Sequence, residues 1–324
     1  MRIIQIHQFG SPEVLKVEEK EEPQVGPNQV VIDVQVAGVC FGDTIIRSGK
    51  YPLPLPLVPG LEVAGRVSGV GSDGDQSLVG KLVVARTKNN TGGYAEQAVV
   101  DATDIFHIPT GLSIEQAVGV FLSGQTAVGL IKAVNITPGE VVLITAAAGS
   151  LGSQLVQQAR AAGAGTVIGA AHGKKKLDLI TQLGADVAID YSEDDWVEQV
   201  RKATDGKGAD LVLDGVGGSI GHQAFEATAK GSGRLGVYGF SSGAWTQIET
   251  RELAARGITV IAPLTIAFAK PPHEARVDAE IALAEAEAGR LTAVIGQTYP
   301  LERAAEAHAA IEARQTTGKV LLIP

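Results

Sequence analysis

The chain has 324 residues, 45% of them hydrophobic and 19% charged, which is enough for a sizeable buried core and about two domains. Its net charge of −9 argues against nucleic acid or an anionic membrane surface as a main partner, and no apolar run approaches the roughly 18 residues that span a bilayer. The N-terminus lacks the apolar region of a signal peptide, and the single cysteine excludes an internal disulfide, which fits a cytoplasmic protein.

Residues 1 to about 120 are predicted to be mostly β-structure. A strand opens at residues 3–6, and residues 29–36 alternate apolar and polar side chains as a half-buried strand does. Short strands separated by glycine turns are predicted at 14–17, 61–70, 80–85 and 97–100, which indicates a small, partly open barrel. Residues 44–48 are predicted to form a short helix with Asp43 as its N-cap, and the proline-rich segment 49–60 to be an extended loop.

The stretch 141–152 combines an apolar strand, a turn of small residues and the start of a helix. Residues 141–144 predict a strand buried on both faces, and residues 153–162 have the apolar spacing of a helix. Between them, residues 147–152 match the dinucleotide-binding pattern G-x-G-x-x-G with alanine at the first position. In such a turn, Gly149 lets the backbone approach a pyrophosphate and Gly152 lets the helix lie close to the strand. The pattern alone also fits an ordinary glycine-rich turn.

The segments that follow support the nucleotide-binding interpretation. Strands at 166–171 and 186–190 around a helix at 174–183 complete a βαβαβ unit. A second half is predicted from strands at 208–214, 234–238 and 259–262 and helices at 196–203, 224–228 and 248–256, which makes about six parallel strands. The C-terminal segment, with helices at 277–288 and 303–313 and strands at 298–301 and 320–323, is expected to return to the first domain.

The end of the second strand of this unit bears on the choice between NAD and NADP. An NAD site usually has Asp or Glu there to accept a hydrogen bond from the ribose 2′-hydroxyl. Here His172 is followed by Lys174, Lys175 and Lys176, and no acid occurs before Asp178. A solvated basic helix start is the alternative, but cations at a helix N-terminus oppose the helix dipole, so an anionic 2′-phosphate explains them better. The pattern therefore favours NADPH.

Together with the fingerprint, six segments carry a family resemblance that covers nearly the whole chain. They are residues 37–43, 47–51, 59–65, 92–96, 184–186 and 317–320. With them the chain resembles the zinc-independent medium-chain dehydrogenases/reductases, and among these the NADPH:quinone oxidoreductases. The resemblance implies an α/β protein in which a GroES-like β-barrel catalytic domain (1–122, completed by 263–324) accompanies a doubly wound Rossmann NADP-binding domain (123–262). It places the active site in the cleft between the domains.

The same architecture serves zinc alcohol dehydrogenases, which hold the catalytic zinc with Cys, His and Cys. At the corresponding positions this chain has Cys40, Leu61 and Ser123. One thiol cannot make a zinc site that needs three protein ligands, and a structural zinc lobe would need four cysteines, so no metal is expected. The quinone reductases usually carry Asn at the position of Cys40. Cys40 itself is interpreted either as a small buried hydrophobic residue or as part of the substrate pocket.

The resemblance also implies which residues bind the cofactor. These are Thr126 near the nicotinamide ribose, Ala148, Gly149, Ser150 and Leu151 along the pyrophosphate, His172 and Lys176 (with Lys175 nearby) at the 2′-phosphate, Tyr191 near the adenosine, Val216 and Gly217 after the fourth strand, Phe240 and Ser241 at the carboxamide, and Arg314 or Lys319 at the phosphates. Tyr191 and Phe240 have the alternative of being core aromatics, and Lys319 that of a solvated charge.

For the substrate pocket the candidates are Cys40, Asp43 and Tyr51. Tyr51 could donate a hydrogen bond to a developing oxyanion or could anchor the proline loop, and Asp43 could serve as a helix cap instead. The implied activity is reduction of a quinone or an α,β-unsaturated carbonyl compound by NADPH. The alternatives are a 2-enoyl-thioester reductase and a non-catalytic NADPH-binding protein. Residues 259–262 are expected to form an edge strand that pairs two copies into a homodimer.

Overall fold

The computed structural model describes residues 1–324, and the contacts within it divide the chain into two compact units. The first unit consists of Met1–Leu122 and Leu283–Pro324, and the second of Ser123–Ala282. The first boundary coincides with the predicted one, but the return to the first unit lies at Leu283 rather than at 263. The reason is that helices α8 (Pro263–Phe268) and α9 (Pro272–Glu287) begin within the second unit, where Asp278 pairs with Lys132 and Lys270.

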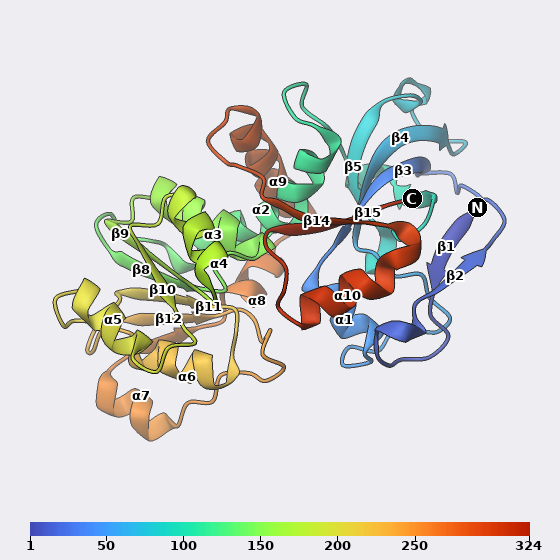
Figure 1. The fold of residues 1–324 in the computed structure, drawn as a ribbon. Coiled ribbons are helices and arrows are strands. Elements are labelled where there is room, and N and C mark those ends of the chain that lie inside the picture. Colours follow the sequence, from blue (N-terminus) through green and yellow to red (C-terminus); the bar gives the residue numbers. More distant parts are fainter. The chain divides into compact units, whose positions relative to one another are not determined.

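The first unit is built on a seven-stranded sheet, as its β-rich sequence predicts (Figure 1). The strand order is β14-β15-β3-β4-β5-β7, and β6 pairs with β3. The strands are β3 (Gln29–Val39), β4 (Glu62–Val70), β5 (Leu82–Arg86), β6 (Gln97–Asp101), β7 (Ile105–His107), β14 (Ile295–Pro300) and β15 (Lys319–Ile323). Val320 of β15 pairs with Val39 of β3, so the end of the chain does return to this sheet.

Smaller elements complete the first unit. They are the antiparallel pair β1 (Arg2–Gln5) and β2 (Lys16–Glu19), helix α1 (Phe41–Arg47) and helix α10 (Ala304–Glu312). The strand predicted at 14–17 starts later than expected, because Pro12–Val14 forms a single 3₁₀ turn instead. The segment 49–60 contains no helix or strand, in agreement with its prolines.

The second unit contains six parallel strands, as predicted (Figure 1). Their order is β10-β9-β8-β11-β12-β13, so successive strands run outward first on one side of β8 and then on the other. The strands are β8 (Val141–Thr145), β9 (Thr166–Ala171), β10 (Val187–Asp190), β11 (Leu211–Asp214), β12 (Arg234–Val237) and β13 (Thr259–Ile261). The helices between them are α3 (Ser150–Ala161), α4 (Lys174–Gln182), α5 (Trp196–Ala203), α6 (Gly218–Glu226) and α7 (Thr250–Arg256). A sheet of this order has its topological switch point between β8 and β11, where ligands of such folds bind.

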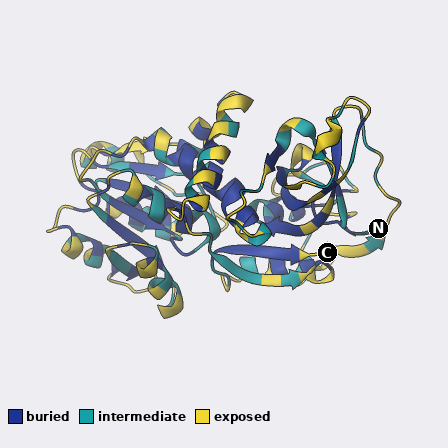
Figure 2. Cartoon of the chain, turned by 90° about the horizontal axis from the view of Figure 1, so that it is seen from above, coloured by how far each residue is buried: buried dark blue, intermediate teal, exposed yellow.

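The central strand β8 is buried on both faces, which explains its unbroken apolar sequence. Val142 and Ile144 pack in one cluster with Leu155 and other residues of α3, whereas Leu143 packs on the other face with Trp196 and Phe225. The dark strands in Figure 2 show this buried layer of the sheet. Alternation of side chains along a strand therefore produces a core on each side from one short apolar run.

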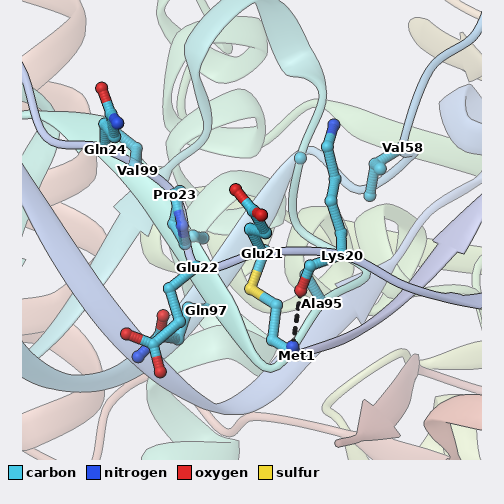
Figure 3. Close-up of a pocket in the computed structure, with 12 residues that line it drawn as sticks. Met1, Lys20, Glu21, Glu22, Pro23, Gln24, Val58, Ala95, Gln97 and Val99 are labelled. Atoms are coloured by element: carbon cyan, nitrogen blue, oxygen red, sulfur yellow. Dashed lines mark hydrogen bonds between the residues drawn. The ribbon is translucent and has the colours of Figure 1, made fainter.

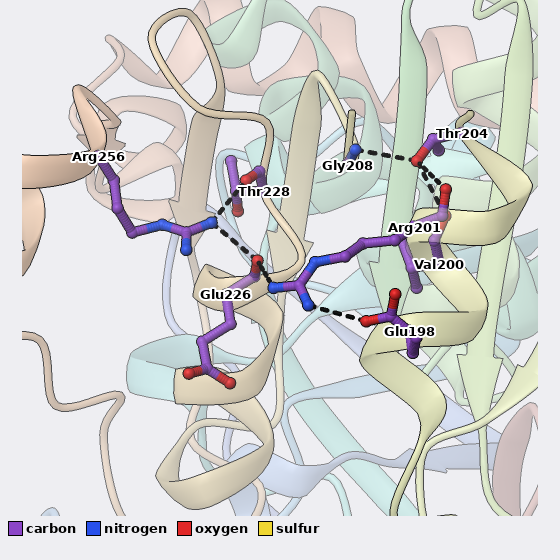
Figure 4. A network of polar contacts seen from close by, with 8 residues as sticks. All are labelled: Glu198, Val200, Arg201, Thr204, Gly208, Glu226, Thr228 and Arg256. Atoms are coloured by element: carbon purple, nitrogen blue, oxygen red, sulfur yellow. Dashed lines mark hydrogen bonds and ion pairs between the residues drawn. The ribbon is translucent and has the colours of Figure 1, made fainter. Parts of the chain in front are cut away.

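Helix α6 begins at Gly218, well before the start predicted at 224. Glycines at 217, 218 and 221 hide its helical periodicity in the sequence. Its C-terminal carbonyls receive side-chain donors from both neighbouring helices (Figure 4). Arg256 donates to the carbonyls of Glu226 and Thr228 at 2.8 and 2.9 Å, and Arg201 to that of Glu226 at 3.4 Å. Cations at this end of a helix also complement its dipole.

Helix α2 (Ile114–Val134) is long and apolar enough to cross a membrane by length and composition. The expectation that no segment approaches that length does not hold for α2. However, most of its apolar stretch is buried inside the protein, as is typical of a core helix.

Candidate active site

The fingerprint turn leads from β8 into α3 and leaves backbone donors free at the head of the helix. Gly149 is the N-cap, in extended conformation and without a side-chain cap, and the first intrahelical bond runs from Ser153 N–H to Gly149 at 2.9 Å. The helix therefore starts at Ser150, earlier than the predicted Ser153. The first-turn N–H groups of Ser150, Leu151 and Gly152 have no carbonyl acceptor within the helix. Together with the helix dipole they form an anion-binding site that fits a dinucleotide diphosphate.

Gly152 allows the close approach of helix and strand that the sequence predicts. A Cβ atom at this position would lie 2.2 Å from the carbonyl oxygen of Ala146 and 2.8 Å from the Cα atom of Ala147. A Cβ atom at Gly149 would meet only the Ala146 carbonyl oxygen, at 3.3 Å. Gly152 is therefore needed for packing, whereas Gly149 leaves space in front of the helix.

The hydroxyl groups of Ser123 and Ser150 lie 2.7 Å apart at this turn. Ser123, which stands at a ligand position of the zinc enzymes, thus contacts a residue of the proposed diphosphate site. Thr126 lies one turn further along α2 and is half-buried.

Two loops at the carboxyl ends of β11 and β12 bring together four of the predicted cofactor residues. The N–H of Ser241 donates to the carbonyl of Gly215 at 3.2 Å, and the N–H of Ser242 donates to the carbonyl of Val216 at 2.8 Å. Phe240 packs against Trp245, with ring centroids 4.5 Å apart. The two loops are therefore hydrogen-bonded to each other beside the switch point, and they carry Val216, Gly217, Phe240 and Ser241.

The end of β9 carries His172 and the lysines, and it adjoins an acid that the sequence argument missed. Asp190 ends the neighbouring strand β10, accepts the N–H of Gly173 at 2.8 Å and lies 3.4 Å from His172 Nδ1. Burial opposes ionisation of this carboxyl, but hydrogen bonds from Ser192 and Gly173 lower the pKa of Asp190 to about 2. Its oxygens are thus occupied by the chain itself. Only parallel pairing of β9 with β10 places it there.

The lysines and Tyr191 around this end differ in their surroundings. Lys174 pairs with Asp178 at 2.8 Å on the exposed face of α4, and Lys175 is exposed, whereas Lys176 is half-buried. Tyr191 packs partly against the apolar cluster that contains Leu143. Tyr191 therefore serves in part as a core aromatic, which is the alternative to a contact with the adenosine.

In the first unit, Cys40 and Asp43 start helix α1 together. Cys40 rather than Asp43 is the N-cap, because Asp43 is the third residue of the helix and its carboxylate accepts the Cys40 N–H at 2.9 Å and thiol at 3.3 Å. The other Asp43 oxygen accepts the N–H of Gly60 at 3.1 Å, and the side chain is fully buried. Asp43 is therefore a structural cap, and its predicted place in the substrate pocket is not supported. Cys40 is half-buried, and burial together with the charge of Asp43 raises the pKa of its thiol, which stays protonated.

Tyr94 and His308 extend this buried polar cluster. The Tyr94 hydroxyl lies 3.0 Å from His308 Nε2, and both side chains are fully buried. Burial and then the charge of Asp43 raise the pKa of Tyr94. Burial and then the charge of Arg47 lower the pKa of His308 to about 3, while burial raises the pKa of Asp43 to about 6. The fold therefore holds a neutral histidine and an acid that is hard to ionise.

These two groups are expected to give the stability of the protein opposing pH dependences. The folded-state pKa of Asp43 lies above its usual 3.8, so its stabilising contribution is complete below about pH 4 and is lost as the pH rises through about 6. The folded-state pKa of His308 lies below its usual 6.5, so its contribution is present above that pH and is lost as the pH falls toward 3. Each amounts to about 1.4 kcal/mol per pH unit, and they oppose each other between about pH 4 and pH 6.

Urea unfolding at a series of pH values would show both. In this range the stability of Asp43→Asn should rise more steeply with pH than that of the wild type, because only His308 still titrates. The stability of His308→Gln should fall as the pH rises, because only Asp43 still titrates. Identical slopes in the two variants would contradict the assignment.

Lys319 does not have the predicted role at a phosphate. Its side chain is fully buried, and its ammonium group pairs with the equally buried carboxylate of Glu62, which also accepts the N–H of Leu122 at 3.3 Å. Burial works against the charged form, but attraction to Glu62 raises the pKa of Lys319. Of the other candidates in this unit, Arg314 is exposed and in left-handed conformation with φ 57°, and Tyr51 is 64% exposed.

A surface hollow of about 620 Å³ lies elsewhere in the first unit (Figure 3). It is lined by Met1, by residues 20–24 and by parts of the segments around Val58 and Ala95, and the amino group of Met1 donates to the carbonyl of Lys20 at 2.6 Å. It contains none of the predicted site residues. No group of three or more His, Cys, Asp or Glu side chains in the chain could hold a metal ion.

Comparison with known proteins identifies the family to which this geometry belongs. The family described as "Alcohol dehydrogenase GroES-like domain" matches residues 26–110, and that described as "Zinc-binding dehydrogenase" matches residues 150–279. A quinone oxidoreductase of Pseudomonas aeruginosa is 34% identical over 99% of both chains. The chain belongs to the quinone oxidoreductase family.

Other relatives and two crystal structures are similar to this chain over nearly its whole length. Quinone oxidoreductase 1 of Escherichia coli is 33% identical, and a 2-haloacrylate reductase of a Burkholderia species is 32% identical, over 99% and 98% of both chains respectively. The crystal structure of Escherichia coli quinone oxidoreductase complexed with NADPH superimposes with a TM-score of 0.91, covers both chains fully and is 32% identical. That of Pseudomonas syringae quinone oxidoreductase has a TM-score of 0.90 at 34% identity and covers 100% of this chain and 99% of its own. The chain is thus an oxidoreductase with the medium-chain dehydrogenase/reductase fold, a GroES-like domain and a Rossmann domain.

Proposed function

We propose that the protein is a metal-independent reductase that uses NADPH to reduce a quinone or an α,β-unsaturated carbonyl compound. The observation that carries the proposal is the head of α3, where three free N–H groups and the helix dipole meet at the switch point between β8 and β11. The NADPH complex of the Escherichia coli relative supports the choice of cofactor, and the names of the quinone oxidoreductases and the 2-haloacrylate reductase support the class of acceptor.

The chain's own part in this reaction is mostly binding and orientation. When bound, NADPH supplies a hydride from its nicotinamide ring. The amides of Ser150, Leu151 and Gly152 would hold its diphosphate, and the loops with Val216 and Phe240 would hold the nicotinamide end. A conjugated acceptor delocalises the charge that develops on it, so it does not depend on a polarising metal, which fits Leu61 and Ser123 at the zinc-ligand positions.

Replacing Lys176 by glutamate is expected to weaken NADPH binding by about tenfold or more and to leave NADH binding nearly unchanged. The half-buried Lys176 lies in the first turn of α4, where a 2′-phosphate would need a cation. Fluorescence titration with both cofactors measures the effect, and Lys202→Glu in the last turn of α5 serves as a control, because it makes the same change of charge at an exposed lysine outside the predicted cofactor residues. Equal losses for NADPH and NADH would contradict the assignment.

Steady-state rates with NADPH and a panel of acceptors test the activity itself. The panel should contain quinones, enones, 2-haloacrylate and 2-enoyl thioesters. Turnover of quinones or enones is the expected result. Preference for thioesters would favour a 2-enoyl-thioester reductase, and tight NADPH binding without turnover of any acceptor would favour a non-catalytic NADPH-binding protein.

We also propose that the protein is a cytoplasmic homodimer paired through β13. This strand ends the sheet, and Val260 on it is 42% exposed. Light scattering of the wild type and of a Val260→Lys variant tests the pairing, and an unchanged mass in that variant would contradict this interface.

A further inference from the structure

Asp214 is a buried acid at the centre of the carboxyl edge of the parallel sheet. It is the last residue of β11, and its side chain is fully buried. One oxygen accepts hydrogen bonds from the Thr145 hydroxyl at 2.8 Å and the Val216 N–H at 2.9 Å, and the other from the Gly217 N–H at 3.1 Å and the Thr246 hydroxyl at 2.7 Å. A buried carboxylate is costly unless such donors surround it.

These donors come from three separate segments. Thr145 ends β8, Val216 and Gly217 follow β11, and Thr246 lies in the long loop after β12. The Thr145 hydroxyl also accepts the Gly215 N–H at 3.0 Å, so the ends of β8 and β11 are joined twice. One carboxylate therefore ties both loops of the nicotinamide end to the central strand.

The packing around this carboxylate leaves no space for a side chain at two neighbouring glycines. A Cβ atom at Gly221 of α6 would lie 2.0 Å from Thr246 Oγ1 and 2.5 Å from Asp214 Oδ2. A Cβ atom at Gly217, whose φ is 71°, would lie 2.2 Å from the carbonyl oxygen of Ala244. The glycines thus allow the two loops and α6 to close over Asp214.

We propose that Asp214 is a positioning residue that holds the loops at 215–217 and 240–246 in the conformation that binds the nicotinamide end of the cofactor. This inference rests on the proposed function, which assigns Val216, Gly217, Phe240 and Ser241 to that end. Asp214 itself is too buried to contact the cofactor, so it acts through the backbone of the two loops.

The test is the variant Asp214→Asn, which has the same shape but presents an NH₂ group to donors. In either orientation the amide presents its NH₂ group to one backbone N–H, that of Val216 or that of Gly217, so a hydrogen bond to the first loop is lost, whereas the Thr246 hydroxyl can turn and accept. The N–H groups of Ser241 and Ser242 donate to the carbonyls of Gly215 and Val216, so a looser first loop also loosens the second. We expect the Kd for NADPH to rise on the order of tenfold. Trp245 lies in the second loop and is 49% exposed, whereas Trp196 is fully buried, so acrylamide quenching of the tryptophan emission reports on this loop without any cofactor. Quenching should increase in the variant.

Asp278→Asn is the matched control. Asp278 is also a buried acid of the second unit, but it pairs with Lys132 and Lys270 rather than with the loops. This variant should lower the Tm without changing the Kd for NADPH or the quenching of Trp245. Thr246→Val, which removes only the link to the second loop, should give a smaller rise in Kd and carries the test if Asp214→Asn does not fold.

The outcomes separate the inference from the proposed function. Wild-type Kd and wild-type quenching in Asp214→Asn or in Thr246→Val would overturn the positioning role, as would a loss of Tm alone. Failure of the wild-type protein to bind NADPH would overturn the proposed function, and the quenching measurement would still decide whether Asp214 orders the loop.

Discussion

Replacing Gly152 by alanine is expected to destabilise the protein by about 3 kcal/mol and to abolish NADPH binding. The added methyl group would lie 2.2 Å from the carbonyl oxygen of Ala146 and 2.8 Å from the Cα atom of Ala147. Both are backbone atoms of the fingerprint turn and cannot rotate away, so α3 has to shift from β8. That shift opens the core between them and moves the free N–H groups. Urea unfolding and a fluorescence titration with NADPH measure the two effects.

Gly149→Ala is the matched control for this substitution. Its methyl group would meet one atom, at 3.3 Å, and the φ of −78° at this position suits alanine. The control should therefore keep its stability within about 1 kcal/mol and lose only NADPH affinity, because the methyl group occupies the space in front of the helix. Native stability in Gly152→Ala would show that the helix tolerates displacement and would contradict the packing argument.

Breaking the buried ion pair between Glu62 and Lys319 is expected to cost about 3–5 kcal/mol. Each side chain is fully buried. Lys319→Met leaves the Glu62 carboxylate with only the hydrogen bond from the Leu122 N–H, and Glu62→Gln leaves the Lys319 ammonium group without its ion-pair partner. The pair fits against Gly38, where a Cβ atom would lie 2.6 Å from Glu62 Oε1 and 2.7 Å from Lys319 Cε. Lys319 lies in β15 and Glu62 in β4, on either side of β3, so the pair joins the C-terminal strand to the sheet of the first unit.

A double-mutant cycle measured by urea unfolding separates the pair from its single charges. The double variant Glu62→Gln/Lys319→Met should lose much less stability than the sum of the single losses, because no unpaired charge remains buried. Glu306→Gln, which breaks an exposed ion pair with Arg303, should leave the stability nearly unchanged. Strictly additive losses in the cycle would show that the two buried charges do not stabilise each other.

Most of the second unit could be predicted from local sequence. The runs at 141–145 and 166–171 are too apolar for a surface strand, and the glycine turn between the first strand and α3 has a known geometry. Gly152 was assigned to close packing because the pattern that contains it needs a residue without Cβ there. The start of α6 is predicted wrongly and α8 is not predicted at all, because glycines at the start of α6 and a proline at the start of α8 interrupt the apolar spacing from which a helix is inferred.

The sequence suggests candidate site residues only where they lie in a single turn or at the end of a single strand. The residues predicted to bind the pyrophosphate are contiguous, so the sequence alone suggests them as one group, and the lysines after β9 are suggested for the same reason. The roles of Asp190 and Asp214 and the pairing of Lys319 with Glu62 could not be predicted, since strand pairing or loop closure brings these side chains to partners that are distant in the chain. The sequence around Lys319 does not distinguish a solvated lysine from one that is buried in an ion pair.

The sequence by itself therefore determined the order of most strands and helices, the glycine turn after the first parallel strand and the absence of a cysteine set for zinc, because each depends on residues that are neighbours or on composition. Only the tertiary structure decided which charges are buried, which acids serve as caps or loop anchors, and which predicted residues share a surface. Those properties depend on what lies opposite a side chain in space, and in this protein the opposite residue comes from another strand or loop.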